Sequence, residues 1–177
     1  MSDTDELDIV FGASSAIGGA LIQRWQRQGR RPILAVTRSA NSISDIGDLN
    51  RVQVETSDYT EAGLSALAAR LMSAQTNVTR LVVCNGVLQG AGYRPERALA
   101  QIDSAAMNEV FEVNTFLPMR VLSAMAPLLK TSAAPIVAAL SARVGSLGDN
   151  RRGGWYSYRS SKAALNMMLQ CLAHELV

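Results

Sequence analysis

Short apolar runs alternate along this chain with longer segments whose apolar residues recur at helical spacing. The short runs end in turn residues, which is typical of buried strands in a parallel sheet, and the longer segments are long enough to be connecting helices. We expect five strands, at residues 7–11, 32–37, 52–55, 80–84 and 135–140. The pattern predicts an α/β fold with a doubly wound parallel sheet and right-handed crossovers.

Helices are expected to fill the gaps between these strands. We expect them at residues 16–28, 60–73, from a cap at Asp103 or Ser104 to Lys130, and from about Trp155 to the C-terminus. Pro118 should kink or interrupt the third helix, because proline lacks the N–H that a helix interior needs.

The length and composition predict a single domain over residues 1–177. A chain of this length that is 48% hydrophobic can bury one core, and we find no linker and no internal repeat. Its 17 basic and 15 acidic residues give a net charge of +2 without long like-charge blocks. We therefore expect a small-molecule partner, with neither nucleic acid nor an anionic membrane surface.

No apolar run approaches the length of a bilayer span and the first residues are acidic, so we expect a cytoplasmic protein. The isolated thiols of Cys84 and Cys171 are expected to be reduced packing residues. The single histidine, His174, excludes a histidine-rich metal site.

The candidate acid/base pair is Tyr158 and Lys162, which lie four residues apart and therefore on one face of a helix. A nearby ammonium group favours the phenolate, so we expect the pKa of Tyr158 to fall from about 10 toward the range of an acid/base catalyst. The other three tyrosines have glycine, serine or arginine at this spacing. Such pairs also arise by chance, so the pair alone is only suggestive.

A glycine turn, Gly12-Ala-Ser-Ser-Ala-Ile-Gly18, directly follows the first predicted strand. Its glycines permit a tight turn, and the amides of the helix that follows can receive a pyrophosphate. The serines can bond phosphate or ribose, or can serve only as turn and cap residues. The alternative is a plain structural turn between a strand and a helix.

Thr37 and Arg38 end the second predicted strand, where a carboxylate would be expected if the protein selected a free adenosine ribose. A hydroxyl and a cation suit the 2′-phosphate of NADP instead. The alternative is an arginine solvated at a strand end. Asp58, beyond the third strand, could accept a hydrogen bond from an adenine amino group or could be an ordinary turn aspartate.

Two further polar residues occupy informative positions. Ser141 closes an apolar run, so its hydroxyl is expected at the carboxyl edge of the sheet, although strand ends often carry a turn serine. Asn114 lies inside a predicted helix, where its amide competes with backbone hydrogen bonds. It either has a specific partner or is satisfied within a kinked helix ahead of Pro118.

Taken together, these motifs closely resemble the short-chain dehydrogenase/reductase family over the whole chain. They comprise the turn from Gly12 to Gly18, Asn85-Gly86 after the fourth strand, Asn114, Ser141 and the pair Tyr158 and Lys162. Residues 141–166 resemble the C-factor-like branch of that family. The resemblance implies a Rossmann-like nucleotide-binding domain.

The family's roles transfer to this chain position by position. Tyr158 would be the acid/base, Lys162 would hold the nicotinamide ribose, Ser141 would orient the carbonyl and Asn114 would hold a water. The implied cofactor contacts are Gly12, Ser14, Ser15, Ala16, Ile17, Gly18, Thr37, Arg38, Asp58, Asn85, Gly86, Tyr158 and Lys162.

The chain departs from the family pattern in three places. Ala16 replaces a glycine of the turn, which would matter if that position needs a positive φ, and Asn85-Gly86-Val87 replaces Asn-Ala-Gly. Family members run to about 250 residues, so we expect a C-terminally truncated chain that lacks two strands, the substrate lid and part of the oligomer interface. An exposed sheet edge should result.

These expectations lead to an NADP(H)-dependent oxidoreductase, with NAD(H) less favoured, that acts on a carbonyl compound or secondary alcohol. The resemblance also implies a homo-oligomer, a dimer or a tetramer. Two alternatives stay open: a non-catalytic nucleotide-binding signalling protein, and an epimerase or dehydratase that uses the same tyrosine.

Overall fold

The computed structural model describes residues 6–29, 31–40 and 51–175, which fall into two units. The sheet unit comprises the described residues up to Cys84 together with Arg120–Ala139, and the helical unit comprises Asn85–Met119 and the described residues from Leu140 onward. The strands of the parallel sheet all belong to the sheet unit.

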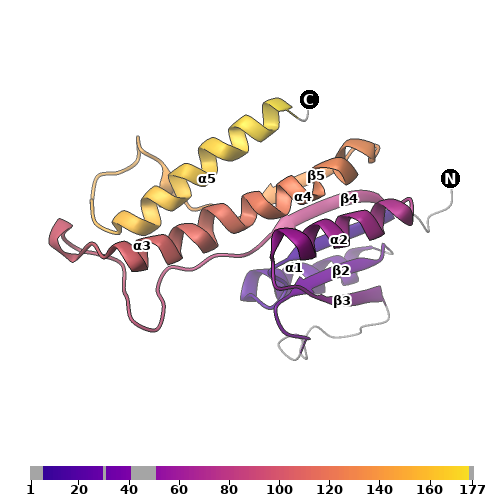
Figure 1. The fold of residues 1–177 in the computed structure, drawn as a ribbon, viewed down its shortest axis with the longest axis horizontal. Coiled ribbons are helices and arrows are strands. Elements are labelled where there is room, and N and C mark those ends of the chain that lie inside the picture. Colours follow the sequence, from indigo (N-terminus) through magenta and orange to yellow (C-terminus); the bar gives the residue numbers. More distant parts are fainter. Residues whose placement is uncertain (1–5, 30, 41–50, 176–177) are drawn as a thin grey trace. The chain divides into compact units, whose positions relative to one another are not determined.

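Among the described residues, five parallel strands form the sheet, in the order β3-β2-β1-β4-β5. Figure 1 shows the neighbouring strands β2 and β3 of this sheet. The strands are β1 (Glu6–Phe11), β2 (Ile33–Thr37), β3 (Val52–Thr56), β4 (Asn77–Val83) and β5 (Ile136–Ala139). Together with its flanking helices the sheet confirms the predicted doubly wound, Rossmann-like fold. Central strand β1 pairs with β2 on one side and β4 on the other, so that Val10 lies opposite Ala35 and Val82.

Strand β4 begins at Asn77, three residues before the predicted start at Arg80. The polar residues Asn77 and Thr79 alternate with apolar ones here and so hide the strand from a search for continuous apolar runs. The Ser132 hydroxyl accepts a hydrogen bond from the Val78 N–H at 3.0 Å, which ties this end of β4 to the turn before β5.

Helices α1 (Ala16–Gln28) and α2 (Glu61–Ser73) lie within one residue of their predicted bounds. Each begins at a hydroxyl cap: Ser15 accepts from the Gly18 N–H, and Thr60 accepts from the Gly63 N–H. The caps satisfy amides that a helix start leaves without backbone partners.

Strand β5 lies at one edge of the sheet that the described strands form. Ile136, on this strand, is 63% exposed. Among the described strands β5 pairs with β4 alone, and the truncation from which we expect an exposed edge stays a prediction.

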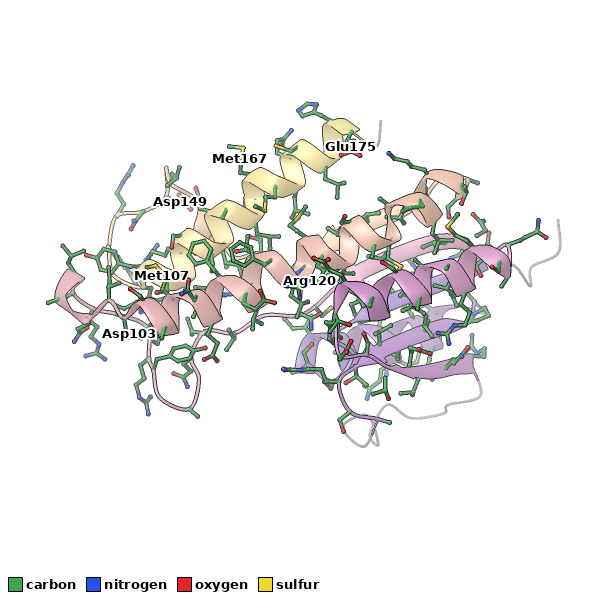
Figure 2. The ribbon with its side chains drawn as sticks, viewed as in Figure 1. Asp103, Met107, Arg120, Asp149, Met167 and Glu175 are labelled. Atoms are coloured by element: carbon green, nitrogen blue, oxygen red, sulfur yellow. The ribbon has the colours of Figure 1, made fainter. Side chains whose placement is uncertain are left out.

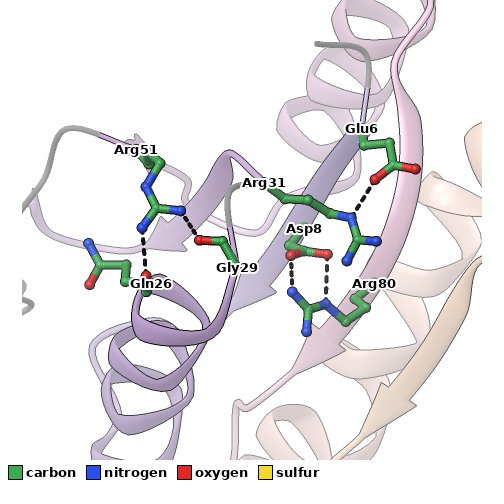
Figure 3. Close-up of polar contacts among 7 residues, drawn as sticks. All are labelled: Glu6, Asp8, Gln26, Gly29, Arg31, Arg51 and Arg80. Carbon is green, nitrogen blue, oxygen red and sulfur yellow. Dashed lines mark hydrogen bonds and ion pairs between the residues drawn. The ribbon is translucent and has the colours of Figure 1, made fainter. Parts of the chain in front are cut away.

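Asp8 is a buried carboxylate in the central strand β1. The guanidinium of Arg80, on β4, bonds both of its oxygens, with 2.8 Å between Nε and Oδ1 (Figure 3). The same guanidinium lies 3.9 Å from the ring centre of Trp25. The neighbouring pair of Arg31 and Glu6 is more open to solvent, with side chains 41% and 34% exposed. Only the first pair therefore neutralises a charge inside the core.

Arg80→Ala is expected to lower the free energy of unfolding by about 3 kcal/mol, because it leaves the Asp8 carboxylate buried without its partner. Arg31→Ala is the matched control and should cost less than about 1 kcal/mol, as exposed ion pairs do. Urea denaturation of the two variants measures the difference. Equal losses would show that burial of Asp8 does not decide the cost.

The helical unit contains α3 (Ser104–Phe111), a π-helical segment (Glu112–Phe116) and α5 (Tyr156–Glu175). Helix α4 (Leu117–Thr131) continues from the π segment, and its residues from Arg120 onward belong to the sheet unit. Asp103 lies at the start of α3 (Figure 2). It caps this helix, because its carboxylate accepts from the Ala106 N–H at 2.8 Å. Two short 3₁₀ turns, Leu99–Gln101 and Arg143–Gly145, complete the unit.

The interruption expected at Pro118 is a π-helical segment that ends two residues before it. The Leu117 N–H bonds to the Glu112 carbonyl, five residues back, so the helix is widened rather than broken. Proline has no N–H to offer the carbonyl of Asn114, four residues earlier, and the wider turn accommodates this loss. Such segments are frequent at functional sites.

Two classes of feature are absent from the described residues. No helix among them is long and apolar enough to cross a membrane. The described residues also contain no cluster of three or more histidine, cysteine, aspartate or glutamate side chains that could hold a metal ion.

Candidate active site

The glycine turn after β1 is built around two positions that exclude side chains. Gly12 has a φ of 73°, and a Cβ on Gly18 would lie 2.5 Å from the Gly12 carbonyl oxygen. Ala16 is the first residue of α1 and is absent from the residues with positive φ, so its methyl group causes no backbone strain. Ala16, which replaces a glycine of the resembled family, therefore leaves the backbone geometry of the turn unchanged.

The other predicted residues of the turn differ in what they offer a ligand. Ser14 is exposed, and the Ile17 side chain is 59% exposed at the start of α1. The hydroxyl of Ser15 is used as the helix cap, which is the structural role that the sequence left open. Ser14 and the amides at the start of α1 are thus the groups that remain for an anion.

Tyr59, between β3 and α2, contacts the glycine turn and was missed by sequence reasoning. Its hydroxyl accepts from the Gly12 N–H and donates to the Val36 carbonyl, both at 3.1 Å. The residue is buried at a φ of 59°, and Arg120 donates to its carbonyl at 3.2 Å. The positive φ of Tyr59 cannot be predicted from sequence. Its position directly after Asp58, a predicted nucleotide contact, was the only sequence signal that it lies near the site.

At the ends of β2 and β3 the structure places the remaining nucleotide candidates. Thr37 is buried, with its hydroxyl 3.4 Å from backbone atoms of Ser39, whereas Arg38 is exposed. Asp58 accepts from the N–H and the hydroxyl of Thr60, which lowers its pKa. The turn role that we weighed for Asp58 is therefore present, and a carboxylate oxygen remains for other contacts.

In the helical unit, Lys162 is 3% exposed, and its ammonium donates to the Leu140 carbonyl at 2.8 Å. Burial lowers the pKa of Lys162 to about 8. A Cβ on Gly86 would lie 3.5 Å from both Lys162 Nζ and Asn114 Oδ1. The structure thus brings three predicted site residues, from three segments, to one point.

Asn114 lies fully buried in the π segment. Its amide donates to the Val87 carbonyl at 2.8 Å and to the Ser161 hydroxyl at 3.2 Å, and it accepts from the Val87 N–H at 2.8 Å. It therefore has specific partners: it fixes the loop that follows β4 against α5. On that loop, the buried Oδ1 of Asn85 has no partner among the described residues.

Ser141 follows β5 and donates to Asn166 Oδ1 at 2.5 Å. Asn166 lies four residues after Lys162 on α5, a spacing that puts both on one side of the helix and could have identified it from sequence. Ser141 is exposed, so its hydroxyl is accessible to a ligand.

Tyr158 is half-buried one helical turn before Lys162, with its ring edge-on to Trp155 at 6.2 Å. Burial raises the pKa of Tyr158, so the lowering expected from its spacing to Lys162 is wrong for this structure. The lysine ammonium bonds the Leu140 carbonyl instead, and the described residues give it no hydrogen bond to the phenol.

Glu96 is a second residue that sequence reasoning missed. Its buried carboxylate accepts from the N–H and the hydroxyl of Ser157, and its carbonyl accepts from the Trp155 N–H. A carboxylate at the N-terminus of α5 favours the helix that carries Tyr158. In sequence the residue lies between two arginines and suggests only a solvated loop.

Comparison with known proteins gives the family. Residues 7–177 match the profile described as short chain dehydrogenase. The chain is 32% identical over 168 residues to 1-hydroxy-2-glutathionyl-2-methyl-3-butene dehydrogenase of Rhodococcus sp., covering 95% of this chain and 70% of that protein. It is 46% identical over 79 residues to C-signal of Myxococcus xanthus, covering 45% and 48% of the two chains.

Solved structures agree with this assignment. A putative short-chain dehydrogenase/reductase from Burkholderia multivorans with bound NADP has a TM-score of 0.81 at 24% identity, covering 97% of this chain and 74% of that one. The putative carbonyl reductase Sniffer of Caenorhabditis elegans has a TM-score of 0.82 at 25% identity, covering 99% and 81%. Because the family profile matches residues 7–177, almost the whole of this chain, the chain belongs to the short-chain dehydrogenase/reductase family of oxidoreductases.

Proposed function

We propose that this protein binds NADP(H) and transfers a hydride between the nicotinamide and a carbonyl compound or secondary alcohol. The observation that carries the proposal is that Gly86, Asn114 and Lys162 lie next to one another. Tyr158 lies one helical turn before Lys162 on α5. The names of the Rhodococcus dehydrogenase and of the NADP-bound Burkholderia protein support it.

The described residues fit such a cofactor. The close packing of Gly18 on Gly12 puts the start of α1 directly after the turn, where its first amides can receive a pyrophosphate, and the buried Asn85 Oδ1 lacks a partner that a ligand would provide. Arg38 would bond the 2′-phosphate, while Lys162 would bond the nicotinamide ribose. When bound, the nicotinamide supplies the hydride.

Tyr158 would supply the proton in the direction of reduction. Burial raises the pKa of its phenol, so at neutral pH the group holds the proton that it has to donate. Ser141 would turn its hydroxyl from Asn166 to the substrate oxygen and stabilise the negative charge that develops there. Asn114 acts indirectly, by holding the loop that carries Asn85 and Gly86.

Titration of NADPH and NADH by fluorescence tests the cofactor assignment. We expect NADPH to bind more tightly, and Arg38→Ala to weaken NADPH about tenfold while NADH changes little, because only NADPH carries the 2′-phosphate. Arg27→Ala is the control, an exposed arginine at the end of α1. Equal affinity for both nucleotides in the unsubstituted protein would overturn the preference.

The identity to C-signal favours a second candidate, a nucleotide-binding signalling protein without turnover. The two functions separate in a screen of ketones, aldehydes and quinones that follows NADPH oxidation at 340 nm. Bound cofactor with no reaction on any compound would favour the signalling role. Oxidation of NADPH by any of them would favour the reductase.

A further inference from the structure

A cavity of about 690 Å³ lies within the helical unit and is bordered by Tyr158. Trp155 and Glu96 line it as well, and both are fixed by the hydrogen bonds at the start of α5. Two arginines, Arg94 and Arg97, also contribute to its lining. The proposed proton donor therefore shares a cavity with two permanent cations.

The acidic groups of this cavity already have partners. The Glu96 carboxylate bonds the N–H and hydroxyl of Ser157, and the Asp103 carboxylate caps α3 through the Ala106 N–H. Both carboxylates keep their charge, but their hydrogen bonds fix them on Ser157 and on the start of α3, and neither forms an ion pair with Arg94 or Arg97 among the described residues.

The side chains of Arg94 and Arg97 are exposed and make no ion pair or hydrogen bond with any described residue. The loop that carries them is nevertheless held at two points: the Arg97 N–H donates to Gln101 Oε1 at 2.7 Å, and the Gly90 N–H donates to the carbonyl of Tyr93, the residue before Arg94, at 3.3 Å. Solvated arginines on a surface loop are the alternative. An anchored loop that places two unpaired guanidinium groups around one cavity favours anion binding instead.

We infer that the substrate carries a carboxylate, which Arg94 and Arg97 bind while its carbonyl oxygen meets Tyr158. This inference rests on the proposed function for the reaction itself. The guanidinium groups would bind the carboxylate through paired N–H donors, so they would contribute to substrate affinity rather than to the proton transfer.

Binding is tested first, without any turnover, by calorimetric titration of the protein with benzoate and with its neutral counterpart benzamide. Benzoate should bind at least about tenfold more tightly, and the double variant Arg94→Gln with Arg97→Gln should lose that difference. The matched control is Arg151→Gln with Arg152→Gln, which removes the same charge from two exposed arginines that do not line the cavity. Benzoate binding that survives the first double substitution, or falls equally in the control, overturns the inference.

Turnover is measured with 4-carboxybenzaldehyde and its methyl ester in the presence of NADPH. The acid should have the higher kcat/KM, and the Arg94 and Arg97 substitutions should raise its KM about tenfold while the ester is unaffected. If the ester is reduced with the same kcat/KM as the acid, the inference that the substrate carries a carboxylate is wrong. Arginine-dependent benzoate binding with no reduction of either aldehyde counts against the proposed function and leaves the anion site supported.

Discussion

Tyr158→Phe is expected to lower turnover by about 10²- to 10⁴-fold, the usual contribution of a positioned acid or base. The substitution removes the phenol oxygen and keeps the ring, so the edge-on contact with Trp155 persists. The NADPH dissociation constant should change by no more than about twofold, because the proton donor contributes mainly in the transition state. Steady-state kinetics with a reducible aldehyde, together with fluorescence titration of NADPH, give the two quantities.

Tyr156→Phe is the matched control, since Tyr156 lies two residues away on the same helix and outside the proposed site. Its turnover should equal that of the unsubstituted protein. Turnover by Tyr158→Phe at the same level as the control would remove the proposed acid/base mechanism.

Lys162→Met is expected to reduce both NADPH affinity and turnover, each by about tenfold or more, because it deletes a buried charge-assisted hydrogen bond donor at the proposed ribose site. Methionine keeps much of the buried apolar length of the side chain. Unlike Tyr158→Phe, this change should therefore affect binding as well as the chemical step. Fluorescence titration and steady-state kinetics again separate the two effects.

The same substitution predicts a pH dependence of stability. Burial lowers the pKa of Lys162 from 10.5 to about 8, so between these values the unfolded chain binds more protons than the folded one. The contribution of Lys162 to the free energy of unfolding should then rise with pH across this window, because folding no longer has to bury its charge. Lys162→Met should lack this rise, whereas the exposed control Lys130→Met should keep it. Parallel curves for all three proteins in urea denaturation from pH 7.5 to 10 would contradict the assignment.

Local sequence patterns predicted most of the sheet unit. The run ending at Phe11 and the cap and stop of α1 depend on neighbouring residues, so they could be read directly from the chain. The start of β4 was missed, because Asn77 and Thr79 interrupt the apolar pattern and their pairing partners lie on other strands. Strand pairing is a contact between distant segments, which a local pattern does not contain.

The candidate site was predicted as a set of residues but not as a set of interactions. The spacing of Tyr158 and Lys162 correctly puts them one turn apart on α5. The direction of the tyrosine pKa was wrong, since it depends on burial and on the Leu140 carbonyl that takes the lysine ammonium. Tyr59 and Glu96 were missed for the same reason: their partners lie 47 and 61 residues away along the chain.

The amino-acid order by itself determined which segments become strands and helices, which turn can bend at Gly12, and which residue types are available for proton transfer. These properties follow from backbone sterics and from periodicity over a few residues. Only the tertiary structure decided which polar groups are satisfied by the protein and which are left for a ligand. Asn114 is fully used by its neighbours, whereas Arg94 and Arg97 find no partner among the described residues, and that difference depends on burial and on contacts across the chain.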